Sequence, residues 1–237
     1  MKDSFKNMFK NLNPMILVIG LLLIMNMINS NQSIGEWLFT QALFLPGIII
    51  GLTCHEAAHA YASHWLGDPT PKIQRRLSLN PIRHMDPLGF VSLIFAGFGW
   101  GKPVEIDPRY YKKRRRDETL VALAGVTANL IIAVLCSFAI KALTSGGTAY
   151  IYGFKEIVFY VIFYAMCINI MLMIFNLLPV PPLDGFGIAT QLFNLRQYSW
   201  YTTVYENGFY ILLALIIFNV IDKILTPAMA FFIEILM

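Results

Sequence analysis

Charged side chains are scarce in this sequence, and that scarcity excludes most classes of soluble protein. Asp, Glu, Lys and Arg make up 14% of the 237 residues, whereas hydrophobic residues make up 57%. Soluble globular domains carry about 25% charged and about 45–50% apolar residues. The mean hydropathy of +0.61 also excludes an intrinsically disordered chain, which combines low hydrophobicity with high net charge. The composition therefore predicts a protein that resides in a lipid bilayer.

Cysteine is nearly absent as well. Only Cys54, Cys136 and Cys167 occur, all within apolar stretches. An odd number of cysteines at these spacings fits neither a disulfide framework nor a cysteine-based zinc site. We therefore expect them to be small hydrophobic residues in the protein interior.

The N-terminus lacks the cleavage site that a secretory signal would need. Three lysines precede an apolar run from Met15 to Ile28, as in a signal peptide, but no alanine occurs between residues 15 and 40. Signal peptides end in a small-residue motif, usually built from alanine. We expect this segment to remain as a membrane anchor.

Long apolar runs, by contrast, are abundant. A helix needs about 20 apolar residues to cross a hydrocarbon core, and the candidate spans are residues 14–30, 37–66, 119–140, 155–178 and 207–236. Residues 87–100 are apolar but too short to cross, so we expect a re-entrant or β-like element whose backbone is covered by protein. The sequence predicts an all-α polytopic membrane protein with about five to six transmembrane helices, in one integral-membrane domain over residues 1–237.

Lys and Arg are distributed unequally between the loops. If the spans alternate in direction, fifteen of the 18 basic residues lie on one face of the membrane and two on the other. By the positive-inside rule the basic face is cytoplasmic, which places the N-terminus in the cytoplasm. The basic run 112–116 precedes the third span and is expected to contact anionic lipid headgroups. Nucleic acid is not an expected partner, because this run lacks a groove-reading context.

The second predicted span contains the motif His55-Glu56-Ala57-Ala58-His59. Two histidines four residues apart lie on one helix face, about one turn apart, which suits a zinc ion. Glu56 projects about 100° away from His55 and can reach a water molecule in the open position of the metal. The alternative is that both histidines only hydrogen-bond to neighbouring helices or lie at the aqueous end of the span.

A catalytic zinc site needs a third protein ligand. His64 points about 140° away from His59 on a helix and is a poor candidate, and His84 would need its loop to fold back. Asp184 is better placed, because it follows three prolines that stop the fourth span. We expect Asp184 on non-helical backbone, with Gly185 adopting an unusual dihedral angle that turns the carboxylate inward.

The predicted topology supports Asp184. The histidine motif and Asp184 both lie near the inner ends of spans that run in the same direction, so they share one depth, as ligands of one metal must. The alternative for Asp184 is a solvated carboxylate in a proline-rich turn.

These motifs resemble the site-2 protease family of intramembrane zinc metalloproteases, in a small form without an appended PDZ or CBS domain. The resemblance covers about residues 45–190 and depends on the histidine motif and on Leu183-Asp184-Gly185, 125 residues after His59. It implies that His55, His59 and Asp184 bind one Zn²⁺ per chain and that Glu56 activates water. Iron or cobalt could occupy the same ligands.

A second element, from Gly125 to Asn129, is similar to a Gly-x-x-x-Asn motif of that family. The two residues share a helix face with small neighbours, so they could serve close helix packing with an interhelical hydrogen bond. Contact with the substrate is the other interpretation, and both options also hold for Asn176. Asn129 and Asn176 are therefore candidate substrate-binding residues.

The resemblance implies cleavage of a peptide bond in or near a transmembrane segment of a membrane protein, with a catalytic core at about residues 37–190. The function would be regulated intramembrane proteolysis or clearance of membrane peptides. The expected partners are that substrate and the lipid bilayer, and a polar channel from the cytoplasmic side would supply water. The alternative is a non-proteolytic metal-binding membrane protein, such as a metal transporter or an inactive assembly factor. A transporter would need ligands along a pathway across the bilayer, whereas only one cluster is visible.

Overall fold

The computed structural model describes residues 33–96, 100–145 and 153–237, and the regular structure in these ranges is helical. Three long helices are apolar enough to cross a membrane: α3 (Ile34–Trp65), α6 (Arg114–Thr144) and α7 (Phe154–Asn176). The shorter helices are α4 (Thr70–Ile73), α5 (Pro87–Ala96), α8 (Asp184–Phe193), α9 (Trp200–Glu206), α10 (Gly208–Ile217) and α11 (Val220–Leu236).

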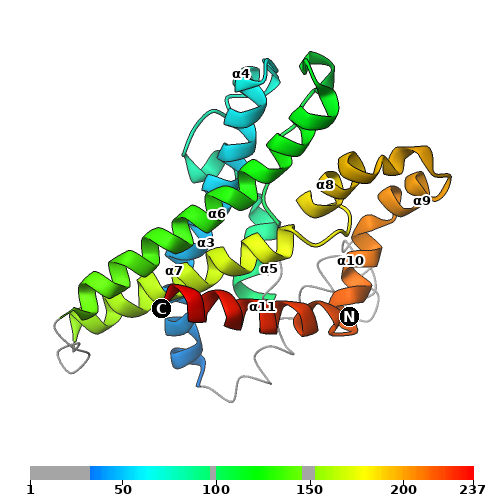
Figure 1. Ribbon diagram of the computed structural model, residues 1–237. Helices are drawn as coiled ribbons and strands as arrows, with labels where there is room; N and C mark the ends of the chain where they lie inside the picture. The colour runs from blue at the N-terminus through cyan, green and yellow to red at the C-terminus, as the bar shows by residue number, and fades with distance from the viewer. Residues whose placement is uncertain (1–32, 97–99, 146–152) are drawn as a thin grey trace, which may run out of the picture.

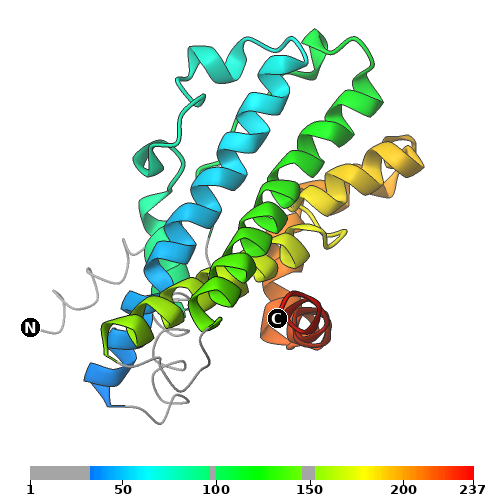
Figure 2. The ribbon, with the colours of Figure 1, turned by 60° about the vertical axis from the view of Figure 1, so that its left-hand side comes forward.

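Helices α3, α6 and α7 each pack against the other two and form the centre of the molecule. Figure 1 shows α11 packed against α7, and α8 and α9 extending beyond the end of α7. Figure 2 shows α3 and α6 as two long neighbouring rods, with the loop that contains α4 at one end of α3. Helix α8, which begins at the candidate ligand Asp184, packs against α6.

The start and end of α3 follow from local chemistry. Its first turn is closed by a capping box, in which Ser33 accepts a hydrogen bond from the Glu36 amide and the Glu36 carboxylate accepts one from the Ser33 amide. The helix ends at Trp65, and Gly67 then adopts a φ of 108°, which L-residues with a side chain rarely adopt.

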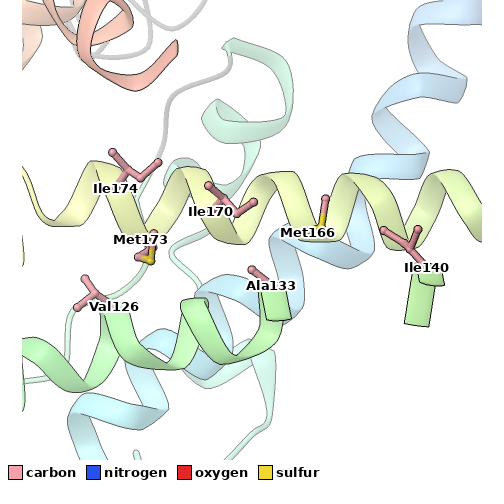
Figure 3. Close-up of a cluster of buried hydrophobic side chains, with 7 residues drawn as sticks. All are labelled: Val126, Ala133, Ile140, Met166, Ile170, Met173 and Ile174. Atoms are coloured by element: carbon pink, nitrogen blue, oxygen red, sulfur yellow. The ribbon is translucent and has the colours of Figure 1, made fainter. Parts of the chain in front are cut away.

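The main hydrophobic core lies between α6 and α7. Figure 3 shows Val126 of α6 next to Met173 of α7. The α6 members of the cluster are spaced by seven positions, so that they share one stripe of the helix. The cluster consists of Val126, Ala133, Ile140, Met166, Ile170, Met173 and Ile174. Residues of α11, among them Leu225 and Phe232, cover it.

The second, third and fourth predicted spans coincide with helices α3, α6 and α7, each long and apolar enough to cross a membrane. The fifth is broken: α10 and α11 meet at a bend of 75° beside Asn219, whose φ of 54° lies in the left-handed region. The described residues therefore contain three candidate spans, or four if the bent pair counts as one. The first predicted span, residues 14–30, lies outside the described residues.

Residues 87–96 form helix α5, so the β-like alternative for this stretch is wrong. Among the described residues the sole β-bridge is the isolated pair Met85 and Gly101. A short apolar run such as this one suits either a short helix or a strand, and periodicity alone does not distinguish the two. The re-entrant placement of α5 stays a prediction.

The loop between α3 and α6 is fastened by the fully buried Asp68. Its carboxylate accepts hydrogen bonds from the Ser63 hydroxyl and from the amides of Thr70 and Asp107, each at 2.8 Å. Burial alone would raise the pKa of Asp68, but these hydrogen bonds outweigh it and leave the pKa below its usual value. Tyr111 joins the same group through the Ser63 hydroxyl at 2.8 Å.

Candidate metal centre

Three side chains that are distant in sequence meet at one point. His55 and His59 lie one turn apart on α3, with 3.0 Å between their Nε2 atoms. The Asp184 Oδ2 atom at the start of α8 lies 3.2 Å from Nε2 of His55 and 3.3 Å from Nε2 of His59. Among the described residues, this is the group of His, Cys, Asp or Glu side chains able to hold a metal ion.

Hydrogen bonding identifies the protonated nitrogen of His59. Its Nδ1 atom lies 2.7 Å from the backbone carbonyl oxygen of Val121. Because a carbonyl oxygen only accepts, Nδ1 carries the proton in this contact. In the neutral ring Nε2 is then a lone-pair donor to a metal.

The same conclusion holds for His55, through a chain of buried amides. Asn129 Nδ2 donates to the carbonyl oxygen of Gly51 at 3.1 Å and to Oδ1 of Asn169 at 2.9 Å. This fixes the amide orientation of Asn129, whose Oδ1 then accepts from Nδ1 of His55 at 2.7 Å. Asn169 is held in turn, because its Nδ2 donates to the carbonyl oxygen of Ala165 at 2.8 Å. His55 therefore also presents an Nε2 lone pair.

The three ligand atoms fit a divalent cation. Two neutral imidazole lone pairs and a carboxylate oxygen would repel one another at these distances without a cation or an added proton between them. Ligands about 2.0–2.1 Å from a tetrahedral zinc ion lie roughly 3.3–3.4 Å apart, close to the separations found here. Asp184 Oδ2 is buried and has no hydrogen-bond partner among the described residues. Imidazole and carboxylate are also the donors that zinc prefers.

Gly125 of α6 forms the floor of the centre. A Cβ atom at this position would lie 2.4 Å from Nε2 of His59 and 2.7 Å from Cε1 of His55. Any side chain here would occupy the space beside the metal-binding atoms. The close packing expected for Gly125 therefore exists, and it is packing against the ligands themselves.

Glu56 lies beside the ligands but faces a different element. Its Oε2 atom accepts a hydrogen bond from the Val104 amide at 3.1 Å. Gly101 lies against the other oxygen, since a Cβ atom there would be 3.2 Å from Glu56 Oε1. The carboxylate thus sits between the metal centre and the irregular segment 101–106.

The backbone around Asp184 differs from the prediction. The prolines do end α7 at Asn176, but Asp184 is the first residue of α8, so its predicted non-helical backbone is wrong. A helix can restart after the proline turn, and a carboxylate in the first turn is favoured by the helix dipole. Gly185 is also helical. Its role is close approach, because a Cβ atom there would lie 2.2 Å from the carbonyl oxygen of Leu177.

A cleft of about 470 Å³, lined by polar and apolar residues, reaches the centre. Glu56, Asp184 and Asn176 line it, whereas Asn129 does not: Asn129 is fully buried behind His55. The Asn176 side chain donates to the carbonyl oxygen of Leu172 at 2.9 Å, within its own helix. Further polar residues lining the cleft are Glu118, Thr190, Gln191, Arg196, Tyr201 and Tyr205.

The remaining histidines lie elsewhere. His84 is fully buried in its loop, with Nε2 2.6 Å from the carbonyl oxygen of Ser78, and His64 Nδ1 lies 3.2 Å from the carbonyl oxygen of Asp68. Neither belongs to the cluster. The sequence interpretation missed Asn169, although a fully buried amide in an otherwise apolar helix is a signal of function within a membrane.

Comparison with known proteins connects this geometry to a family. A model of peptidase family M50 matches residues 152–219. "Putative zinc metalloprotease YwhC" of Bacillus subtilis (strain 168) is 36% identical over 180 residues, which cover 76% of this chain and 82% of that protein. "Putative zinc metalloprotease Rip2" of Mycolicibacterium smegmatis is 28% identical over 188 residues, covering 76% of this chain and 69% of that protein. No solved structure gave a significant match.

Proposed function

The chain belongs to peptidase family M50, which confirms its resemblance to the site-2 proteases, and we propose that it is a zinc metalloprotease that cleaves membrane-protein substrates within or near a transmembrane segment. Its relatives are named as zinc metalloproteases, and three of its helices are long and apolar enough to cross a membrane. In this proposal His55, His59 and Asp184 bind one zinc ion and Glu56 is the catalytic residue.

One observation carries the proposal. Two imidazole lone pairs and a carboxylate oxygen converge within 3.0–3.3 Å in a buried site, and the next side chain in the motif is a carboxylate that lines the adjoining cleft. A metal site used only for binding has no need of Glu56 beside it. A hydrolytic site needs a base there.

The chemistry divides between the metal and the chain. Bound zinc would supply Lewis acidity, which lowers the pKa of coordinated water and polarises a carbonyl group. Glu56 takes the proton of the attacking water and later returns it to the leaving nitrogen. Asp184 and the two histidines hold their donor atoms close enough together to bind one metal ion. Val104 holds the Glu56 carboxylate in place through its amide.

The substrate must expose its peptide bond before attack, because helical hydrogen bonds shield it. We propose that an unwound substrate segment pairs along residues 100–104, next to Glu56, by adding an edge strand. Replacing Trp100, Gly101 or Lys102 by proline, one at a time, should impair cleavage of a membrane substrate and leave zinc content unchanged. Full cleavage by all of these variants would contradict edge pairing.

The distribution of basic residues supports a cytoplasmic N-terminus and an active site toward the cytoplasm. The cleft would then admit water from that side. Single cysteines at Leu66 and Gly187 should react with membrane-impermeant thiol reagents added from the cytoplasmic side. Labelling only from the opposite side would contradict this orientation.

The substitution Glu56→Gln separates a protease from a metal-binding protein without hydrolytic activity. The variant should keep one zinc ion per chain, measured by elemental analysis of the purified protein, and lose cleavage. Comparing membrane proteomes of cells that carry the active or the Glu56→Gln protein would identify substrates as proteins that accumulate uncleaved. A metal transporter or inactive assembly factor would keep its activity in this variant, and that outcome would refute the proposal.

A further inference from the structure

Helix α8 is attached to α6 at the end remote from Asp184. A Cβ atom at Gly187 would lie 4.0 Å from that of Ala122, and Gln191 is hydrogen-bonded to Glu118. Residue numbers rise along α8 as they fall along α6, so the two helices are antiparallel. Figure 2 shows α8 beside the N-terminal half of α6. The metal ligand therefore stands at one end of α8 and the attachment at the other.

The attachment consists of Arg115, Glu118, Gln191 and Arg196, which we call the α8 clamp. The Glu118 side chain is only 10% exposed and accepts hydrogen bonds from the side chains of Gln191 and Arg196, the latter at 2.8 Å. Arg115 donates to the carbonyl oxygens of Gln191 at 3.0 Å and of Leu192 at 3.3 Å. The last carbonyls of a helix lack partners within the helix, so Arg115 satisfies groups that would otherwise be free.

The other end of α8 is held by packing and not by a side-chain hydrogen bond. No side-chain cap closes its first turn, and Phe186 is buried there against the ring of Tyr201. An α-helix of ten residues is a stiff rod about 15 Å long. A slide or rotation of α8 at the clamp therefore moves the Asp184 carboxylate by a similar amount.

We propose that the α8 clamp positions Asp184 for metal binding. Its four members are positioning residues: they touch neither His55 nor His59, and they act by fixing α8 along α6. This inference rests on the proposed function, in which Asp184 completes a zinc site. It adds that zinc affinity depends on contacts at the far end of α8.

The clamp also borders the cleft, since Glu118, Gln191 and Arg196 line it. A role in contacting the substrate would predict altered cleavage with unchanged zinc affinity. A positioning role predicts instead that zinc affinity falls, and that cleavage falls because less zinc is bound. Zinc affinity measured without substrate separates the two.

The test uses the full-length chain in detergent, with zinc affinity measured by competition with a chelator. Glu118→Ala should weaken zinc binding by about tenfold, the lower end of the range for residues that hydrogen-bond to a metal ligand directly, because Glu118 acts through α8. Arg114→Ala is the matched control. Arg114 binds the same carboxylate at 2.7 Å, but from α6 itself and with a side chain 58% exposed. This control should change zinc affinity by less than about threefold.

Arg115→Gln should also weaken zinc binding, because it removes the hydrogen bonds of the guanidinium group to α8 and leaves Glu118 in place. Arg115→Lys keeps a cationic donor and should restore part of the affinity. In cobalt-substituted protein, the clamp variants should also alter the visible absorption of the metal, and Arg114→Ala should not. Wild-type zinc affinity in both Glu118→Ala and Arg115→Gln would overturn the positioning role, whereas a wild-type chain that binds no zinc would refute the proposed function as well.

Discussion

The metal-binding side and the catalytic side of the centre are built in different ways. His55 and His59 donate hydrogen bonds to buried oxygen atoms of α6, and Asn129, the partner of His55, is oriented in turn by Asn169 of α7. Glu56 is held by one backbone hydrogen bond from Val104, in an irregular segment beside an open cleft. Metal affinity and proton transfer therefore depend on separate parts of the molecule. Substitutions should therefore affect one without the other.

The largest effect on the metal-binding side is expected from Gly125→Ala. The added Cβ atom would lie 2.4 Å from Nε2 of His59, and the backbone of α6 cannot retreat without losing its packing against α3. Zinc affinity should fall by more than about 100-fold, beyond the range of outer-contact substitutions. Equilibrium dialysis against buffered zinc measures this loss.

Gly187→Ala is the control for that substitution. It adds the same methyl group to a helix near the centre, but its Cβ atom would meet only Ala122 at 4.0 Å. Alanine is also the better helix former, by about 1 kcal/mol, so folding should be unchanged or improved. An equal loss of zinc affinity in both variants would contradict a steric role of Gly125 beside His59.

The next largest effect should come from the buried amides. Asn129→Leu removes the acceptor that orients His55, so zinc affinity should fall by about 10–100-fold. Asn169→Leu acts one contact further away and should cost less, because Asn129 keeps its bond to Gly51. Metal competition assays on both variants should give this order. If Asn129→Leu reduced cleavage at full zinc affinity, Asn129 would belong to the substrate-binding side instead.

A smaller effect, confined to the catalytic side, is expected from Val104→Pro. Proline has no amide hydrogen, so Glu56 loses its donor and one orientation restraint. We expect kcat to fall by about tenfold, the scale of a single lost hydrogen bond of about 1.4 kcal/mol, with zinc content unchanged. Val104→Ala keeps the amide and should cleave at nearly the wild-type rate. Zinc loss in the proline variant would show that the two sides are not independent.

The sequence could predict features that depend on local contacts, but not those that depend on long-range packing. Helical spacing was sufficient to bring His55 and His59 onto one face, and the proline run was sufficient to locate the end of α7. Both features are local. The antiparallel packing of α8 on α6 is not, because it depends on contacts between residues more than 70 positions apart, such as Glu118 with Gln191. The helical backbone of Asp184 was missed for the same reason.

Long-range pairing also explains the residues that the sequence interpretation overlooked. Asn169 gains its role only through Asn129, 40 positions away, and Val104 only through Glu56, 48 positions away. Val104 acts through its backbone amide, which nearly every residue type has, so no sequence motif could identify it. Asn169 could have been found by asking why a membrane helix buries an amide.

The smallest effect on the centre is expected from Asp68, which fastens the loop on the catalytic side. The pKa of Asp68 is held below its usual value, so its stabilising contribution is present above about pH 4 and is lost as the pH falls through the lowered pKa. Asp68→Asn should lower the free energy of local loop opening by about 1–3 kcal/mol at neutral pH. Limited proteolysis within residues 66–113 measures that opening, and the difference from wild type should shrink as the pH falls below about 4. Zinc affinity should not change, because Asp68 contacts α3 in its last turn, at Ser63, and hydrogen-bonds to none of the metal ligands. A parallel loss of zinc would show that the metal-binding and catalytic sides are coupled.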